Sequence, residues 1–409
     1  MASEHVQTLS LTLTGDDRPG VTSTILGAIS GTGAEVLDIQ QVAVHGHLTL
    51  ALLLDPGDHS DDLRDAAAVA AHRLGLSLTV LEGSGDNARP RQGRAAVVVL
   101  GAPLLADAVG LVTAQIADHG ANIDRIRRLS RYPVTTVEFD ISGAFVPALR
   151  NELALVAASS AIDIAVAPGG LARRGRRLVV LDVDSTLIQQ EVIEMLAAHC
   201  GREDEVAAVT ARAMAGELDF EQSLRARVAT LAGLPESVLA EVRQEIVLTP
   251  GARTLVRTLK RLGFTVGLVS GGFIEIVGGL AAELGIHHAR ANRLEIRDGV
   301  LTGGLVGEVV DRAGKAAALR EFATLEGLPL SRTVAIGDGA NDLDMLHIAG
   351  LGVAFNAKPL VREQAHTSVN VPYLDSVLYL LGITREEIEE ADLDDGTPTA
   401  APPVPGVRP

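Results

Sequence analysis

The sequence predicts an α/β protein in which two small βαββαβ modules precede a doubly wound parallel sheet with an inserted helical cap. Three observations support this fold class. The segment Gly33–Val36 recurs as Gly120–Ile123, which indicates a tandem module. The apolar run Leu178–Leu181 leads directly into an acidic stretch, as at the carboxyl end of a buried parallel strand. Beyond it, strand patterns alternate with helical ones, which is typical of doubly wound sheets.

Composition places the chain among globular proteins and excludes several classes of partner. Hydrophobic residues make up 47% of the 409 residues, and a formal net charge of −17 offers no basic field for nucleic acid or anionic lipid. The single cysteine, Cys200, excludes an intramolecular disulfide framework. Neither a signal-like segment nor an apolar run of membrane-spanning length is visible. We therefore expect a cytoplasmic protein that binds neither nucleic acid nor membrane.

The first module is expected over residues 5–83. An alternating strand leads through the turn Gly15–Gly20 into an amphipathic helix with Ile25 and Ile29 on one face. The expected elements are a strand at 6–14, a helix at 21–30, strands at 36–45 and 48–54, a helix at 60–74 and a strand at 77–81. This order is that of the ferredoxin-like split βαβ unit.

The second module is expected over residues 94–167, after a polar linker rich in turn-forming residues at 83–93. A strand at 95–100 and a helix at 107–119 precede the repeated segment, and Ile126 keeps the register of Ile39. Both modules should therefore share one fold.

The loop Asp16–Val21, between the first strand and the first helix, resembles that of ACT domains, which are small amino-acid-sensing modules. The resemblance implies an effector site lined by Asp17 and Gly20, where a helix N-terminus could receive the carboxylate of an amino acid such as L-serine. It also implies a homodimer. A plain turn explains the same residues without a ligand. In the second module Asp107 stands where Gly20 stands in the first, and its carboxylate would disfavour a ligand carboxylate.

The largest domain is expected over residues 176–384. A helical pattern of about sixty residues, 189–247, is too long for a simple crossover and predicts the inserted cap. Further strands are expected at 265–269, 333–336 and 351–355, with a hairpin at 294–306 that turns at Arg297–Gly299. Residues 385–409 become acidic and then rich in proline and alanine, which predicts a disordered tail.

Polar residues follow three of the strands expected in this domain. Asp182 and Asp184 follow the strand at 178–181, Ser270–Gly272 follow the strand at 265–269, and the loop Gly337–Asp342 follows the strand at 333–336. Because such strands end at one edge of a sheet, these side chains should converge there. Clustered carboxylates are costly without a cation, and hard oxygen ligands suit Mg²⁺. Taken singly, each group has an ordinary explanation as a turn residue or, for Lys315, as a solvated helix charge.

Taken together, the groups predict phosphoryl transfer. Asp182 and Asp338 can ligate Mg²⁺, while Ser270 and Lys315 can hold phosphoryl oxygens. A carboxylate within reach of phosphorus can attack it and form an aspartyl-phosphate. Asp184 would protonate the leaving alcohol and later activate water.

These motifs, in this order, resemble the four motifs of the haloacid dehalogenase superfamily: Asp182–Thr186, Ser270–Gly272, Lys315 and Gly337–Asp342. The resemblance implies a fold of that type and assigns roles. Asp182 is the nucleophile and a Mg²⁺ ligand, and Asp184 is the proton donor and acceptor whose backbone carbonyl also ligates the metal. Asp338 completes the protein ligands, and Asp342 orients water on the metal. The residues implied to bind phosphate are Ser270, Gly271, Lys315 and Asn341.

Two charged residues of the cap bear on the substrate. Glu191 and Arg227 resemble residues of phosphoserine phosphatases in which the acid meets the substrate ammonium and the arginine its carboxylate. Met214 and Phe220 match the apolar residues that close the pocket. The resemblance thus implies hydrolysis of O-phospho-L-serine to L-serine, the last step of serine biosynthesis. Without it, Glu191 and Arg227 read as solvated helix charges.

Two alternatives stay open at this point. Nearly the same pocket would serve a phosphatase or phosphotransferase for another phosphorylated amino acid, such as phosphothreonine or homoserine phosphate. An amino-acid sensor with an inert phosphatase fold is the other alternative. The complete set of four aspartates argues against the sensor.

Overall fold

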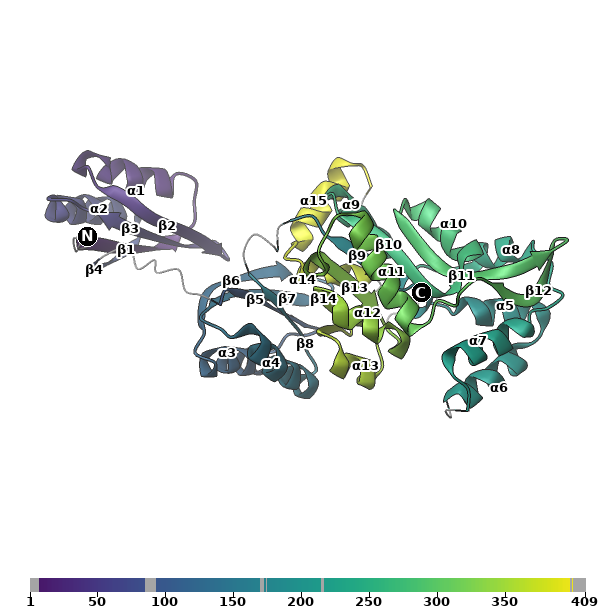
Figure 1. The fold of residues 1–409 in the computed structure, drawn as a ribbon. Helices are drawn as coiled ribbons and strands as arrows, with labels where there is room; N and C mark the ends of the chain where they lie inside the picture. The colour runs from purple at the N-terminus through teal and green to yellow at the C-terminus, as the bar shows by residue number, and fades with distance from the viewer. Residues whose placement is uncertain are drawn as a thin grey trace. The chain divides into compact units, whose positions relative to one another are not determined.

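The computed structural model describes residues 7–84, 93–169, 173, 175–214, 217–397 and 399, without the side chain of Met214. It divides into two compact units, residues 1–90 and 91–409, and each is described by itself (Figure 1). Within the described ranges, no helix is long and apolar enough to cross a membrane.

The first unit is a four-stranded antiparallel sheet in the order β2-β3-β1-β4, with two helices packed on it (Figure 1). Its elements are β1 (Gln7–Asp16), α1 (Val21–Ile29), β2 (Glu35–Val44), β3 (His47–Asp55), α2 (Ser60–Leu74) and β4 (Ser77–Ser84). Leu9, Leu11 and Leu13 of β1 are buried in the core with the helices, as the period of a half-buried strand requires. The βαββαβ order confirms the ferredoxin-like prediction.

The second module has the same topology, with strand order β6-β7-β5-β8. Its elements are β5 (Ala95–Gly101), α3 (Ala106–Asp118), β6 (Asn122–Ser130), β7 (Thr135–Ser142), α4 (Val146–Ser160) and β8 (Asp163–Pro168). Every residue of β5 is buried. Val97 and Val99 pack in the core of the module, whereas Val98 and Leu100 pack in the core of the large domain. This two-sided burial explains why β5 is continuously apolar while β1 alternates.

The large domain is built on a seven-stranded sheet in the order β12-β11-β10-β9-β13-β14-β15 (Figure 1). All neighbouring pairs are parallel except β11 with β12. The strands are β9 (Leu178–Leu181), β10 (Thr265–Phe273), β11 (His288–Arg297), β12 (Val300–Val306), β13 (Thr333–Gly337), β14 (Leu351–Phe355) and β15 (Thr367–Val369).

Helices cover both faces of this sheet. Val179 and Leu181 of β9 pack on the side of α9 and α10, whereas Leu178 and Val180 pack on the side of α11 and α12. The helices outside the cap are α9 (Ala252–Arg261), α10 (Ile274–Leu284), α11 (Arg312–Leu325), α12 (Leu343–Ile348), α13 (Pro359–Gln364), α14 (Val377–Leu380) and α15 (Arg385–Asp394). The doubly wound prediction is thereby confirmed.

Four helices form an insertion between β9 and α9. They are α5 (Val192–Cys200), α6 (Glu203–Met214), α7 (Phe220–Ala229) and α8 (Val238–Glu245). The segments that enter and leave this insertion lie side by side. The Gln189 N–H donates to the Val247 carbonyl (3.0 Å), and the Thr249 N–H donates to the Leu187 carbonyl (2.9 Å). The two crossings form a short two-stranded connection to the sheet.

A buried carboxylate joins the second module to the large domain. Asp163, at the start of β8, is 4% exposed. It accepts hydrogen bonds from the backbone N–H of Asn370 (2.7 Å), from Asn370 Nδ2 (2.6 Å) and from Ser368 Oγ (3.0 Å). Burial raises the pKa of Asp163, and the hydrogen bonds from β15 and from the residue that follows it oppose this shift.

The carboxyl-terminal segment is folded through residue 397, so the prediction of a disordered tail is wrong there. Helix α15 starts at a capping box made by Thr384 and Glu387, and Ile388 is buried in the main core. The predicted tail also includes residues 398 and 400–409, which lie outside the described residues.

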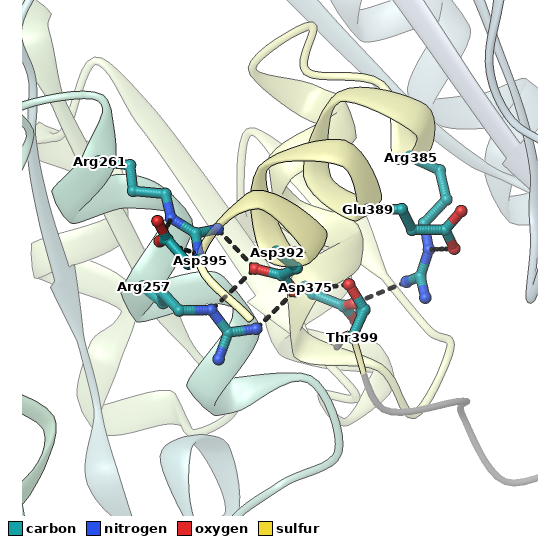
Figure 2. A network of polar contacts seen from close by, with 8 residues as sticks. All are labelled: Arg257, Arg261, Asp375, Arg385, Glu389, Asp392, Asp395 and Thr399. Atoms are coloured by element: carbon teal, nitrogen blue, oxygen red, sulfur yellow. Dashed lines mark hydrogen bonds and ion pairs between the residues drawn. The ribbon is translucent and has the colours of Figure 1, made fainter. Parts of the chain in front are cut away.

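Charge pairing holds α15 against α9. Asp392 is fully buried and accepts hydrogen bonds from Arg257, Arg261 and Thr399 (Figure 2). Burial alone would raise the pKa of Asp392, but these hydrogen bonds lower it from 3.8 to about 2. The low apolar content of this segment predicts disorder, but ion pairs with a distant helix and the burial of Ile388 hold it in place.

Asp392→Asn is expected to lower the free energy of unfolding by about 2 kcal/mol at pH 7, because Arg257 loses its charged partner and Arg261 keeps only Asp395. A folded-state pKa below 3.8 means that this stabilisation is present above pH 3.8 and is lost as the pH falls toward 2. Urea unfolding at pH 7 and pH 3 should therefore show a wild-type advantage that shrinks with acid. Asp394→Asn, an exposed position on the same helix, is the control; equal effects of the two variants would contradict the prediction.

Candidate active site

Three adjacent strands end at one edge of the large sheet and carry the acidic and hydroxyl residues that the sequence singles out. Strand β9 pairs in parallel with both β10 and β13. Asp182 follows β9, Ser270 lies near the end of β10, and Asp338 follows β13. The backbone N–H of Asp182 donates to the Ile336 carbonyl (2.9 Å), which keeps the β9 and β13 ends together. The parallel register therefore produces the convergence.

Asp182, Asp338 and Asp342 form an acidic cluster. One carboxylate oxygen of each lies within 4.8 Å of the others. Burial and then the charge of Asp342 raise the pKa of Asp182 well above 3.8, and the same two causes raise the pKa of Asp338 to about 6. Carboxylates this close need positive charge among them, and an all-oxygen donor set fits a hard cation such as Mg²⁺.

Lys315, in the first turn of α11, supplies one positive charge. Its Nζ lies 2.8 Å from Asp182 Oδ1 and 2.7 Å from Asp342 Oδ1, and the side chain is fully buried. Burial alone would lower the pKa of the ammonium group, but the two carboxylates raise it above its ordinary value. Lys315 therefore stays charged, yet one ammonium against three carboxylates leaves an excess of negative charge.

Asp184 is held beside this cluster by hydrogen bonds. Its Oδ1 accepts from the Val192 N–H (2.8 Å), and its Oδ2 accepts from the Ser270 hydroxyl (3.0 Å). Ser270 Oγ in turn accepts from the Gly272 N–H (2.7 Å). Burial raises the pKa of Asp184, which favours a carboxyl group that can carry a proton.

The turn between β9 and the cap adds two residues to which sequence reasoning gave no role. Ser185 adopts φ 55, in the left-handed region that non-glycine residues rarely occupy, and its Oγ donates to Glu191 Oε1 (2.7 Å). Thr186 Oγ1 donates to Asp338 Oδ1 (2.8 Å). In the sequence they differ from ordinary turn residues only by their place in the acidic motif.

Glu191 and Arg227 come from the start of α5 and the last turn of α7. Burial, and then the charge of Asp184, raise the pKa of Glu191 to about 7. Burial lowers the pKa of Arg227, although the charge of Glu191 opposes this. The Nε of Arg227 is shielded from solvent and has no hydrogen-bond partner among the described residues. A buried donor of this kind is costly, so an anionic ligand here would be favoured.

Two of the other predicted substrate residues, Gly271 and Phe220, lie beside each other at the Ser270 turn. A Cβ added to Gly271 would come within 3.3 Å of Phe220 Cζ, so the cap ring lies directly against the Ser270 turn. Asn341 lies in the short 3₁₀ turn Ala340–Asp342, next in sequence to the acidic cluster. The side chain of Met214 lies outside the described residues.

The two predicted effector residues lie in the first unit, in the loop between β1 and α1. Gly20 caps the N-terminus of α1 with φ 92, a conformation that glycine adopts without strain. The backbone N–H of Asp17 donates to the Gly46 carbonyl (2.7 Å). These contacts order the loop at the start of the helix.

Comparison with known families matches all three parts of the chain. Residues 179–347 match the haloacid dehalogenase-like hydrolase family. Residues 7–80 and 94–167 each match an ACT domain family.

Similar proteins match over a longer stretch. The chain is 59% identical to a phosphoserine phosphatase of Streptomyces coelicolor, covering 95% of this chain and 96% of the relative. It is 52% identical to phosphoserine phosphatase SerB2 of Mycobacterium tuberculosis, covering 94% and 95%. The crystal structure of a probable phosphoserine phosphatase from Vibrio cholerae, in unliganded form, superposes with a TM-score of 0.56 at 35% identity, covering 70% of this chain and 86% of that one.

Local geometry alone would leave the class of hydrolase open, since an acidic cluster with a buried lysine suits several phosphoryl-transfer enzymes. The similarity extends beyond that cluster through the cap and both amino-terminal modules. The protein therefore belongs to the phosphoserine phosphatase family of haloacid dehalogenase-like hydrolases, with two amino-terminal ACT domains.

Proposed function

We propose that the protein hydrolyses O-phospho-L-serine to L-serine and phosphate through an aspartyl-phosphate on Asp182. The observation that carries this proposal is the position of Asp182 at the tip of the central strand β9, held by a buried lysine. Asp182 Oδ1 accepts from the Val183 N–H (2.8 Å) and contacts Lys315 Nζ. Among the described residues, Oδ2 accepts no hydrogen bond, which supports Oδ2 as the attacking oxygen.

A divalent cation, Mg²⁺, fits the excess negative charge of the site. Asp182 and Asp338 would hold it with side-chain oxygens and Asp184 with its backbone carbonyl, while Asp342 stays paired with Lys315. When bound, it would neutralise charge on the phosphoryl oxygens.

Asp184 is proposed as the proton carrier. As Asp182 bonds to phosphorus, the bond to the serine oxygen breaks, and Asp184 gives its proton to that oxygen. In the second half, Asp184 takes a proton from the water that attacks the phosphorus and frees Asp182. Its hydrogen bonds to Val192 and Ser270 support the role, because they fix the carboxyl group beside the nucleophile.

Four sets of residues from the cap and core are proposed to recognise the substrate. Glu191 would meet the ammonium group, and Arg227 would meet the carboxylate with its planar fork. Ser270, the amide of Gly271, Lys315 and Asn341 would hold the phosphate, with Phe220 and Met214 closing the pocket. The unpartnered Nε of Arg227 supports this assignment.

Purified protein should release phosphate from O-phospho-L-serine in the presence of Mg²⁺. Removal of the metal by a chelator should stop turnover, and added Mg²⁺ should restore it. A panel with phosphothreonine and homoserine phosphate measures the strictness of the pocket. Faster turnover of either compound than of phosphoserine would overturn the substrate assignment.

We further infer that the ACT domains bind an amino acid such as L-serine near Asp17 and Gly20, and that the chain is a homodimer in the cytoplasm. The edge strand β2 supports the dimer, because Val36, Ile39 and Val44 expose 46%, 44% and 61% of their surface. Sedimentation velocity should show a dimer at micromolar concentration, and a monomer there would contradict this inference.

A further inference from the structure

Asn292, in β11, has a buried side-chain amide whose nitrogen and oxygen both form hydrogen bonds. Its side chain is 2% exposed. Nδ2 donates to the Gly271 carbonyl (2.8 Å), and Oδ1 accepts from the Val310 N–H (2.7 Å). The partners determine the orientation of the amide, since a carbonyl only accepts and an N–H only donates. Sequence reasoning passed over this residue, because one asparagine within a strand pattern has no distinctive spacing.

The bond to Gly271 fills a gap in the sheet. Strands β10 and β11 pair Val269 with Arg290 and next pair Phe273 with Asn292. The chain of β10 therefore uses two more residues than its partner between these pairs, and Ser270–Gly272 bulge out of the ladder. A bulge leaves backbone groups without a ladder partner. The amide of Asn292 supplies that partner for the Gly271 carbonyl.

Fixing this carbonyl also orients the opposite side of the peptide. In a trans peptide, the carbonyl of Gly271 and the N–H of Gly272 point in opposite directions. With the carbonyl held by Asn292, the N–H points to Ser270 Oγ (2.7 Å), and Ser270 Oγ donates to Asp184 Oδ2 (3.0 Å). The bulge that carries Ser270 is therefore held from the sheet side by one residue.

The other end of the amide holds the approach to a second phosphate-binding segment. Val310 lies just before α11, whose first turn carries Lys315. Its N–H is bonded to Asn292 Oδ1, so one side chain ties the Ser270 turn to the segment that leads into Lys315. These two segments lie about forty residues apart in sequence. Apart from this tie, α11 packs on β10 through the apolar core they share, with Val269, Val310 and Phe322 in one cluster.

We propose that Asn292 is a positioning residue for the phosphoryl site, which sets the spacing between the Ser270 turn and the Lys315 helix. It touches neither the substrate nor the reacting atoms. The proposal rests on the proposed phosphatase function. Loss of this tie should impair every phosphate monoester equally, because it acts at the phosphoryl end and not at the amino-acid end.

Asn292→Leu tests the proposal, because it keeps the shape and removes both hydrogen bonds. We expect kcat to fall about 10- to 100-fold for phosphoserine and for p-nitrophenyl phosphate alike. The dissociation constant of inorganic phosphate, measured by calorimetry with Mg²⁺ present, should rise about tenfold. Asn370→Leu is the matched control, since the same swap removes a 2.6 Å bond to Asp163 at the joint with the second ACT domain.

The outcomes separate this proposal from the proposed function. Wild-type kcat and phosphate affinity in Asn292→Leu, or equal losses in Asn370→Leu, would overturn the positioning role. If wild-type protein binds phosphate but does not hydrolyse phosphoserine, only the substrate assignment is overturned. The phosphate dissociation constant of Asn292→Leu would still test the positioning role. If the leucine variant does not fold, Asn292→Ala replaces it, because alanine adds no bulk. Its kcat and phosphate affinity are then expressed per folded molecule and judged by the same criteria.

Discussion

Replacing Asp182 by asparagine should lower kcat for phosphoserine at least about 10³-fold while the fold is kept. An amide is a poor nucleophile toward phosphorus, but it has nearly the shape of the carboxylate and can accept the same hydrogen bond from the Val183 N–H. Burial and the charge of Asp342 disfavour the ionised form of Asp182. In metal-free buffer the variant should therefore unfold at the wild-type temperature or above.

Phosphate release and thermal unfolding measure the two halves of this prediction. Asp298→Asn makes the same substitution in the turn of the β11–β12 hairpin and should leave both quantities near wild type. Full turnover in Asp182→Asn would contradict an aspartyl-phosphate on this residue. A large loss of stability would show that Asp182 acts mainly as the partner of Lys315.

Arg227→Ala should reduce kcat/KM for phosphoserine about 100-fold, chiefly through a higher KM. The guanidinium is proposed to bind the substrate carboxylate, and charge-assisted hydrogen bonds of this kind contribute about 1.5–3 kcal/mol each. An aryl phosphate has no such carboxylate, so its kcat/KM should change less than about threefold. Steady-state kinetics with both substrates gives the comparison.

Arg225→Ala is the matched control on the same helix. Arg225 is exposed and pairs with Glu221, so its removal should affect neither substrate. Equal losses on phosphoserine and on the aryl phosphate in Arg227→Ala would place the arginine at the phosphoryl group. Asn292→Leu is instead expected to impair both substrates alike, so the two variants together separate the amino-acid end of the substrate from its phosphoryl end.

The acidic part of the site was predictable because two of its aspartates follow apolar strands directly. Asp182 and Asp338 are adjacent to runs that must be buried, and parallel strands bring their carboxyl ends to one edge. The local sequence pattern therefore predicted that side chains far apart in sequence lie close together in the folded protein. Lys315 was harder to place, since nothing in its own helix distinguishes a lysine buried between two carboxylates from a solvated one.

The folded tail and the role of Asn292 were not predicted from the sequence for the same physical reason. Residues 385–397 look too polar to fold, yet α15 is held by Arg257 and Arg261, which lie far away in sequence. Asn292 is inconspicuous because its two partners come from other segments. Hydrogen bonds and ion pairs between polar groups far apart in sequence follow no periodicity, so a sequence pattern does not reveal them.

The order of the modules, the strands and the chemistry at the strand ends follow from the amino-acid sequence alone, because burial imposes a period on apolar residues and each reaction needs particular side chains. Which polar groups pair with each other becomes visible only in the folded protein: Lys315 pairs with two aspartates, Asp392 with two arginines, and Asn292 bonds to two separate segments. Those pairings depend on distances of a few ångströms between segments that meet only after the chain has folded.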